Sequence, residues 1–109
     1  MPFTFEDMLT RSKLERRVLT AWIEEGWVAP ARDGEGYSFD EVDAARVGFI
    51  VELTQELAIG EEAVPVVLSL VDQLNALHIT VRKVLEAIED LPEPGRGRIA
   101  ALLTEIDRV

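Results

Sequence analysis

The sequence predicts a mainly α-helical fold with one small β-hairpin, and three observations lead to this prediction. Apolar residues recur at helical spacing over most of the 109 residues. One glycine-rich turn separates two short extended segments between Trp27 and Phe39. Hydrophobic residues make up 48% of the chain, which is enough for a packed core. We expect residues 1–60 to form one domain, and residues 61–109 to form a long helix and a short C-terminal helix.

The first 26 residues predict two short helices. In the segment TFEDML, Thr4 is expected to be the N-cap of the first helix, with Asp7 as its partner in a capping box. A break near Lys13 leads into the second helix, and Gly26 is placed to terminate it. The apolar residues of the second helix share one face: Leu14, Val18, Trp22 and Ile23. Two helices of this length have the dimensions of a helix-turn-helix.

A small hairpin, or wing, is expected next. The segments WVAP and GYSF have the composition of short strands. Asp33, Gly34 and Gly36 supply the turn between them, because glycine accepts the backbone conformations that tight turns require.

A third helix is expected over residues 39–57. Ser38 and Glu41 stand at the spacing of a second capping box, and Ile59 and Gly60 close the helix. The apolar residues expected to share its buried face are Val42, Ala45, Phe49, Leu53 and Leu57.

The fourth helix, expected over residues 61–90, has the most regular pattern in the chain. Its apolar residues alternate at spacings of three and four, which is the heptad pattern of a coiled-coil seam. The residues of this predicted dimer seam are Val67, Leu70, Leu74, Leu77, Val81, Val84 and Ile88. Glu61 and Glu62 are expected in the first turn, where the helix dipole favours acids. A self-paired homodimer is the simplest use of such a seam.

The segment PEPGRG breaks the chain before a short last helix. The apolar residues of that helix share one face: Ile99, Leu102, Leu103 and Ile106. A helix this short is only marginally stable alone, so it is expected to fold back onto the seam helix or onto a partner chain.

Charge limits the classes of partner. The chain has 21 acids and 11 Lys or Arg, a net charge of −10. Both halves are acidic, with ten acids and six bases up to Gly48 and eleven acids and five bases after it. DNA binding draws much of its free energy from bases that neutralise phosphates, so this balance makes nucleic acid an unfavourable partner. A basic protein surface would be attracted.

Other functional classes lack the residues they need. The chain has no cysteine and a single histidine, His78, which excludes disulfides, thiolate nucleophiles and sites built from several cysteines or histidines. No catalytic pairing and no phosphate-binding glycine loop is present, so we predict a protein that is not an enzyme and uses no cofactor or metal. The start MPFTFEDML is acidic, unlike a secretory signal, and no apolar run reaches about 18 residues. We expect a cytoplasmic protein without a membrane association.

The order of helices and wing resembles the MerR-type winged helix-turn-helix. The segments that carry the resemblance are FTFEDML, WIEEGWVAP and GYSFDEVDAARVGFIVEL. It implies a mainly α fold, a MerR-like winged helix-turn-helix with a small β-hairpin wing, followed by a long dimerisation helix and a short C-terminal helix. DNA-reading members of that superfamily place an Arg-Tyr-Tyr-like cluster where this chain has Thr20, Ala21 and Trp22. The wing offers one arginine, Arg32, for phosphate contacts.

Within that superfamily the segment ELAIGEEAVPVVLSLVDQLNAL, residues 56–77, resembles the bacterial chaperone-modulator family of the CbpM type. This resemblance implies a regulator that binds the J-domain of a DnaJ-like (CbpA-type) co-chaperone and inhibits its engagement of Hsp70. Two alternatives stay open, namely a MerR-like DNA-binding transcriptional regulator and a dimerisation module with another partner.

Because J-domains, as a family, present a basic helical surface, acids near the third and fourth helices are the candidate partner-binding residues. They are Glu52, Glu56, Glu61, Glu62 and Asp72. Each of them has the simpler interpretation of a solvated helix face or a helix-dipole partner. His78 is expected at the edge of the seam, and helical spacing favours core packing for Trp22 and Trp27 over a role as a partner anchor.

Overall fold

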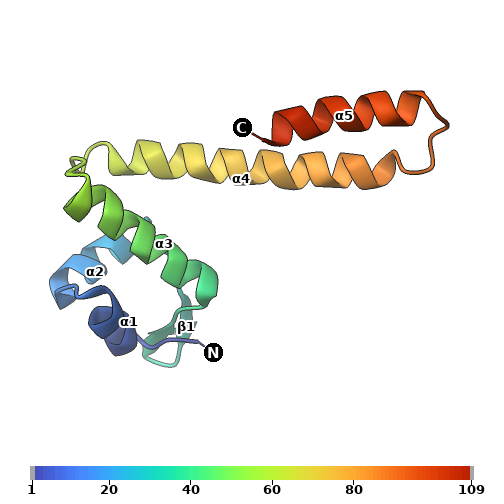
Figure 1. The fold of residues 1–109 in the computed structure, drawn as a ribbon. Helices are drawn as coiled ribbons and strands as arrows, with labels where there is room; N and C mark the ends of the chain where they lie inside the picture. The colour runs from blue at the N-terminus through green and yellow to red at the C-terminus, as the bar shows by residue number, and fades with distance from the viewer. Residues whose placement is uncertain (1, 109) are drawn as a thin grey trace. The chain divides into compact units, whose positions relative to one another are not determined.

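The computed structural model describes residues 2–108, and the chain divides into two compact units, residues 1–66 and 67–109. The fold is mainly helical with one two-stranded hairpin, as predicted (Figure 1). The first unit holds a helix-turn-helix, the wing and a third helix; its fully buried residues are Met8, Leu19, Val28, Phe39, Val47, Ile50 and Val64. The second unit contains most of the long helix and the C-terminal helix.

Helix α1 (Phe5–Ser12) begins at the predicted capping box. The backbone N–H of Asp7 donates to Thr4 Oγ1 at 3.1 Å, and the backbone N–H of Thr4 donates to Asp7 Oδ2 at 2.9 Å. Two N–H groups that a helix start leaves without partners are thereby satisfied. The helix ends at Lys13, which has the left-handed backbone conformation with φ +56°.

Helix α2 (Arg16–Glu24) is terminated by Gly26, as predicted. Gly26 has φ +79°, which costs glycine little, and its N–H donates to the carbonyl of Ile23 at 3.0 Å. The N–H of Trp27 donates to the carbonyl of Trp22 at 2.9 Å. These two bonds form a Schellman motif, which stops the helix and turns the chain toward the wing.

The wing pairs strand β1 (Ala31–Asp33) with strand β2 (Gly36–Ser38) in antiparallel register, Ala31 opposite Ser38 and Asp33 opposite Gly36. The prediction that the first strand is WVAP was wrong. Val28 is instead buried in the core, and Pro30 has no N–H for a strand ladder, so pairing begins after it.

Helix α3 (Glu41–Val51) has its capping box two residues later than predicted. Ser38 is held in β2, and the N-cap is Asp40, whose carboxylate accepts the N–H of Asp43 at 2.7 Å. The N–H of Asp40 donates to Asp43 Oδ2 at 3.0 Å. Glu41 was predicted to be the partner in the capping box, but it does not take part in it.

A short π-helix, η1 (Glu52–Glu56), continues α3, so the predicted helix over residues 39–57 is two segments. The predicted buried face was wrong in part, since Val42 is 75% exposed, Leu57 is 65% exposed and Ala45 is exposed, whereas Leu53 is buried as predicted. The residues buried on this side are Ala44, Val47, Ile50 and Leu53. The sequence of this helix offers two apolar faces, one that starts at Val42 and one that recurs every three residues from Ala44. Packing against the rest of the unit buries the second face.

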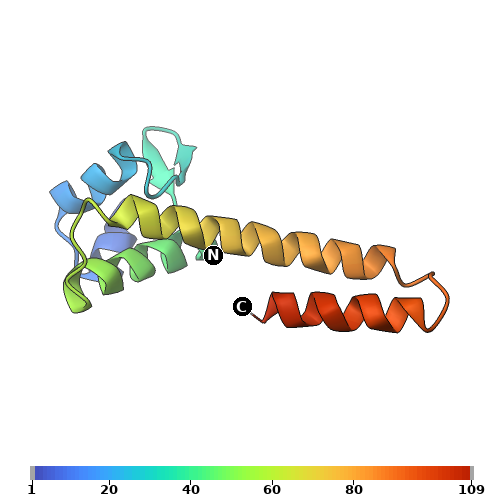
Figure 2. The same cartoon turned by 90° about the horizontal axis from the view of Figure 1, so that it is seen from above.

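Helix α4 (Val64–Ala87) and helix α5 (Gly95–Asp107) form an antiparallel pair in the second unit, and both views show them side by side (Figures 1 and 2). Of the two surfaces expected for the last helix, the seam helix or a partner chain, the structure shows it on the seam helix of its own chain. His78 Nε2 of α4 lies 3.8 Å from Asp107 Oδ1 of α5. Helix α4 begins three residues later than predicted, so Glu61 and Glu62 lie in the turn before it.

Helix α4 is long and apolar enough to cross a membrane by length and composition, with a mean hydropathy of 1.4 over its most apolar 18-residue window. Only 17% of that window is buried. The apolar side chains of α4 are therefore largely exposed, which demands an explanation of what covers them.

Candidate functional site

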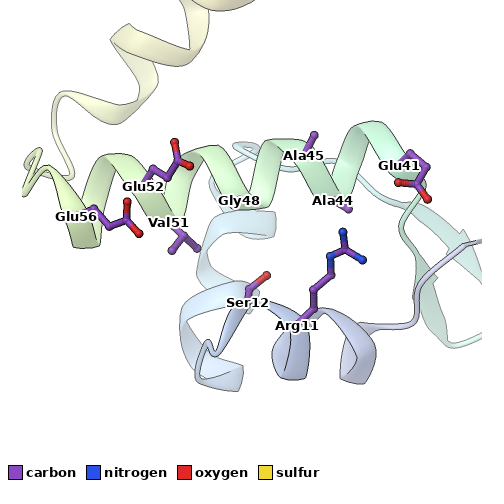
Figure 3. A pocket seen from close by; sticks show the side chains of 9 residues that line it. All are labelled: Arg11, Ser12, Glu41, Ala44, Ala45, Gly48, Val51, Glu52 and Glu56. Atoms are coloured by element: carbon purple, nitrogen blue, oxygen red, sulfur yellow. The ribbon is translucent and has the colours of Figure 1, made fainter.

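A groove of about 420 Å³ lies between α1 and the helix formed by α3 and η1 (Figure 3). All of its lining residues belong to the first unit. They are Arg11, Ser12, Glu41, Ala44, Ala45, Gly48, Val51, Glu52 and Glu56. Figure 3 shows Arg11 extending from α1 toward α3, while the three glutamates are spread along the length of α3 and η1.

The groove exists because the middle of α3 carries small residues. The surface of α3 is recessed where α1 faces it, because the residues there are small: Ala44, Ala45 and Gly48. A Cβ atom added at Gly48 would have no neighbour within 4 Å, so the space beside this glycine is open. Glycine in a helix interior costs about 1 kcal/mol relative to alanine, and the helical conformation here does not require it. Gly48 therefore contributes volume to the groove rather than a special backbone conformation.

The rim of the groove is acidic. Glu41, Glu52 and Glu56 are exposed, and the one basic residue of the lining is Arg11. The guanidinium of Arg11 stacks over the ring of Phe3, 4.8 Å from its centroid. Three carboxylates and one engaged guanidinium give a local negative potential, which attracts cationic side chains of a partner.

The acidity of the groove continues over its unit. Residues 1–66 contain fourteen acids and six bases, a net charge of −8, whereas residues 67–109 contain seven acids and five bases, a net charge of −2. Most of the negative charge of the chain is thus carried by the unit that holds the groove.

The five predicted partner-binding residues fall in three places. Glu52 and Glu56 line the groove. Glu61 and Glu62 are exposed in the turn before α4, and Asp72 is exposed on α4 in the second unit. The structure thus brings two of the five predicted acids together.

Sequence reasoning missed the other lining residues. Glu41 was assigned to a capping box, although Asp43 takes that role and leaves Glu41 to the groove. Ala45 was expected to be buried, and it is exposed in the lining. A glycine in the middle of a helix was the one available signal, since Gly48 has no backbone reason to be there.

The arginines of the first unit are engaged within the unit. Arg16 pairs with Glu6 and stacks over Phe5 at 5.1 Å, and Arg17 donates to Glu15 at 2.9 Å. The other three arginines also have partners in the unit: Arg11 lies over Phe3 at 4.8 Å, Arg32 lies over Tyr37 at 4.8 Å, and Arg46 donates to the carbonyl of Trp27. A DNA phosphate would have to compete with these contacts.

The residues of α2 that align with the DNA-reading cluster are Thr20, Ala21 and Trp22. They provide few groups that could contact the edge of a base. Trp22 is 6% exposed and lies 6.3 Å, centroid to centroid, from Trp27, so the core packing predicted for Trp22 is confirmed. Thr20 and Ala21 are exposed. Within residues 2–108 no three His, Cys, Asp or Glu side chains are placed to hold a metal ion.

Comparison with known proteins gives one match. A family model described as MerR HTH family regulatory protein matches residues 3–86 of this chain. Neither the curated proteins nor the solved structures contain a match. The matched region includes the helix-turn-helix, the wing, the groove and almost all of α4.

Proposed function

We propose that this chain, which belongs to the MerR HTH family of regulatory proteins, is a non-enzymatic regulator that binds the J-domain of a DnaJ-like co-chaperone and inhibits its engagement of Hsp70. The observation that carries the proposal is the acidic groove, with Glu41, Glu52 and Glu56 at its rim, in a unit of net charge −8. The finer family assignment rests on the chaperone-modulator resemblance of residues 56–77.

The groove suits a helical basic partner. A volume of about 420 Å³ accepts one or two long side chains. Lysine or arginine side chains of the J-domain would lie along the small residues Ala44 and Gly48 and reach the carboxylates of Glu52 and Glu56. Complementary charge speeds the encounter and penalises acidic competitors. Bound there, the J-domain surface that Hsp70 uses would be covered.

A DNA-binding transcriptional regulator is the second candidate, and the family match itself favours it. Against it stand the net charge of −10 and the arginines that are already engaged with Glu6, Glu15 and aromatic rings. Counterion release from DNA requires bases that are available to phosphates. We therefore favour protein binding over DNA binding as the function of this chain.

The proposal includes a homodimer in the cytoplasm, with no cofactor and no membrane. The heptad residues of α4 support the dimer, because Leu70, Leu77 and Val84 recur every seven residues and are 59%, 45% and 39% exposed. Exposed apolar repeats of this kind are covered in coiled-coil assemblies.

The test is isothermal titration of the full chain with the J-domain of the DnaJ-like protein encoded nearest its gene. The variant Glu52→Lys/Glu56→Lys should bind at least tenfold more weakly than the natural protein, which corresponds to about 1.4 kcal/mol. The matched control is Glu24→Lys/Glu25→Lys, which makes the same charge change at exposed positions at the C-terminal end of α2 and outside the groove.

Two outcomes would reject the proposal. One is natural protein that does not bind the J-domain, together with a selective mobility shift of duplex DNA at an ionic strength of about 0.15 M. The other is equal weakening by the groove variant and the control, which would assign the effect to total charge and remove the groove from the site.

A further inference from the structure

Four residues form one straight row along the groove, on the helix that α3 and η1 make together. They are Glu41, Ala45, Gly48 and Glu52, and all four are exposed and belong to the groove lining. They stand at positions i, i+4, i+7 and i+11, so at about 100° per residue they lie within about 60° of one another around the helix axis. We call these four residues the α3 row. It has a carboxylate at each end and two small residues between them.

The length of the α3 row limits what it can bind. At a rise of about 1.5 Å per residue, the backbone positions of Glu41 and Glu52 are about 16.5 Å apart along the helix axis. Two carboxylates with this separation cannot share one metal ion, because oxygen ligands lie within about 2.6 Å of a cation. The row extends over three helical turns, which is the length of a docked helical segment.

The centre of the α3 row allows another helix to come close. Ala45 has a single methyl group, and a Cβ atom added at Gly48 would meet no atom within 4 Å. The distance between packed helix axes is about 8–10 Å and depends on the side chains at the contact, so small residues favour the shorter distance. Ser12 of α1 lines the groove beside the row (Figure 3). A helix that lies along the row can therefore contact the middle of α3 and reach both carboxylates.

The charge of the groove selects a basic helix. The α3 row contains no base, and Glu56 of η1 adds a third carboxylate beyond the Glu52 end. Arg11 is the one base in the lining, and its guanidinium is engaged over the ring of Phe3. Charge complementarity thus favours a helix with cations opposite both ends of the row and disfavours an acidic helix.

This chain does not itself carry the matching pattern. Two side chains eleven positions apart project from one face of a helix, because eleven residues make three turns with a remainder of about 20°. No two of the 11 Lys and Arg residues of this chain have that spacing. A second copy therefore has no helix that could present two such cations to the row, and the occupant is a different protein.

We infer that the α3 row docks one helix of a partner protein, and that this helix carries two Lys or Arg residues eleven positions apart with small or apolar residues between them on the same face. The two cations meet Glu41 and Glu52, and the residues between them pack against Ala45 and Gly48. The inference rests on the proposed function, because it specifies which pattern of a basic helix the groove recognises.

Two synthetic helices test the pattern. Both are peptides of alanine and glutamine with two lysines, about 18 residues long so that they form helices in water. The lysines are eleven positions apart in the first peptide and nine apart in the second, which places them on opposite faces. In fluorescence anisotropy with the full chain at an ionic strength of about 0.01 M, the first peptide should bind about fivefold more tightly. Circular dichroism checks that the two peptides have equal helix content.

Variants of the protein that remove two carboxylates identify the contacts. Glu41→Gln/Glu52→Gln should bind the two peptides equally. Glu35→Gln/Glu61→Gln is the matched control, since it makes the same charge change at exposed positions outside the groove, and it should keep the preference. Equal binding of both peptides to the natural protein would overturn the inference, as would a preference that persists in Glu41→Gln/Glu52→Gln. Spermine that binds as tightly as the first peptide would also overturn it, because the row would then be a site for small polycations.

Titration with the J-domain measures the proposed function separately. A J-domain that does not bind, together with a retained preference for the first peptide, would reject the J-domain as the partner and leave the docking pattern standing. A J-domain that binds a protein without any peptide preference would reject the docking pattern and leave the proposed function standing.

Discussion

His78 Nε2 on α4 lies 3.8 Å from Asp107 Oδ1 on α5, and this contact joins residues 29 positions apart across the second unit. Both side chains are 25% exposed. No hydrogen bond reaches Asp107 Oδ1 within the described residues, although the atom is buried. We predict that Asp107→Asn loosens the end of α5 by at most about 1 kcal/mol, which is the upper end of the range for partly exposed charged contacts.

Hydrogen exchange measures this effect, and the amides of α5 should exchange faster in Asp107→Asn. Glu105→Gln is the control, since Glu105 pairs with Arg108 at 3.2 Å on the exposed side of α5. Equal protection of α5 in the two variants would show that the contact with His78 contributes nothing to docking.

Gly48→Ala should stabilise the protein by about 0.5–1 kcal/mol, because the added Cβ meets no neighbour within 4 Å and alanine is the better helix former. Gly26→Ala also meets open space, yet it should destabilise the protein because φ at this position is +79°. Urea unfolding of the two variants checks the opposite signs. A larger side chain in Gly48→Leu should fill the groove and weaken partner binding while the protein stays folded.

Asp40→Ala should cost about 1 kcal/mol, since it removes the carboxylate that accepts the N–H of Asp43 at the start of α3. Ser38→Ala should have little effect, because Ser38 is in the wing and caps no helix. Thermal unfolding of the two variants distinguishes the observed capping box from the one that the sequence suggested. The reverse order of effects would contradict the observed start of α3.

Burial raises the pKa of the Asp43 carboxyl above its ordinary value of 3.8, and the nearby charge of Asp40 acts in the same direction. The folded protein therefore holds this proton more tightly than the unfolded chain does. The contribution of Asp43 to stability is complete below pH 3.8 and is lost as the pH rises through the raised pKa of the folded state.

Asp43→Asn should remove this dependence while keeping an oxygen that accepts the N–H of Asp40. Relative to the natural protein, the variant should gain stability as the pH rises from about 3 to 7. Urea unfolding across that range measures the gain, and a difference between the two proteins that stays constant with pH would contradict the assignment.

The sequence predicted those features that depend on neighbours along the chain. The capping box of Thr4 and Asp7, the glycine stop at Gly26 and the turn at Gly34 each rest on local backbone geometry, and each was found. The last helix was expected to fold back for the equally general reason that a short helix needs a surface.

Features that depend on packing could not be predicted in this way. Two apolar faces of α3 were equally periodic, and only burial of Val47 and Ile50 against the rest of the unit selects one. The site shows the same division: charge alone suggested Glu52 and Glu56, whereas Arg11 belongs to the lining because α1 lies opposite α3. No short-range pattern reveals that Asp107 is the partner of His78.

The uneven division of charge, −8 in residues 1–66 and −2 in residues 67–109, has a consequence for how the protein responds to its surroundings. Added salt screens the attraction between the acidic groove and a basic partner, but it barely affects contacts between apolar helices. Raising the ionic strength should therefore release the proposed partner while leaving the proposed homodimer intact. If both proposals hold, the dimer would persist at high salt and bind the partner again when the ions are diluted.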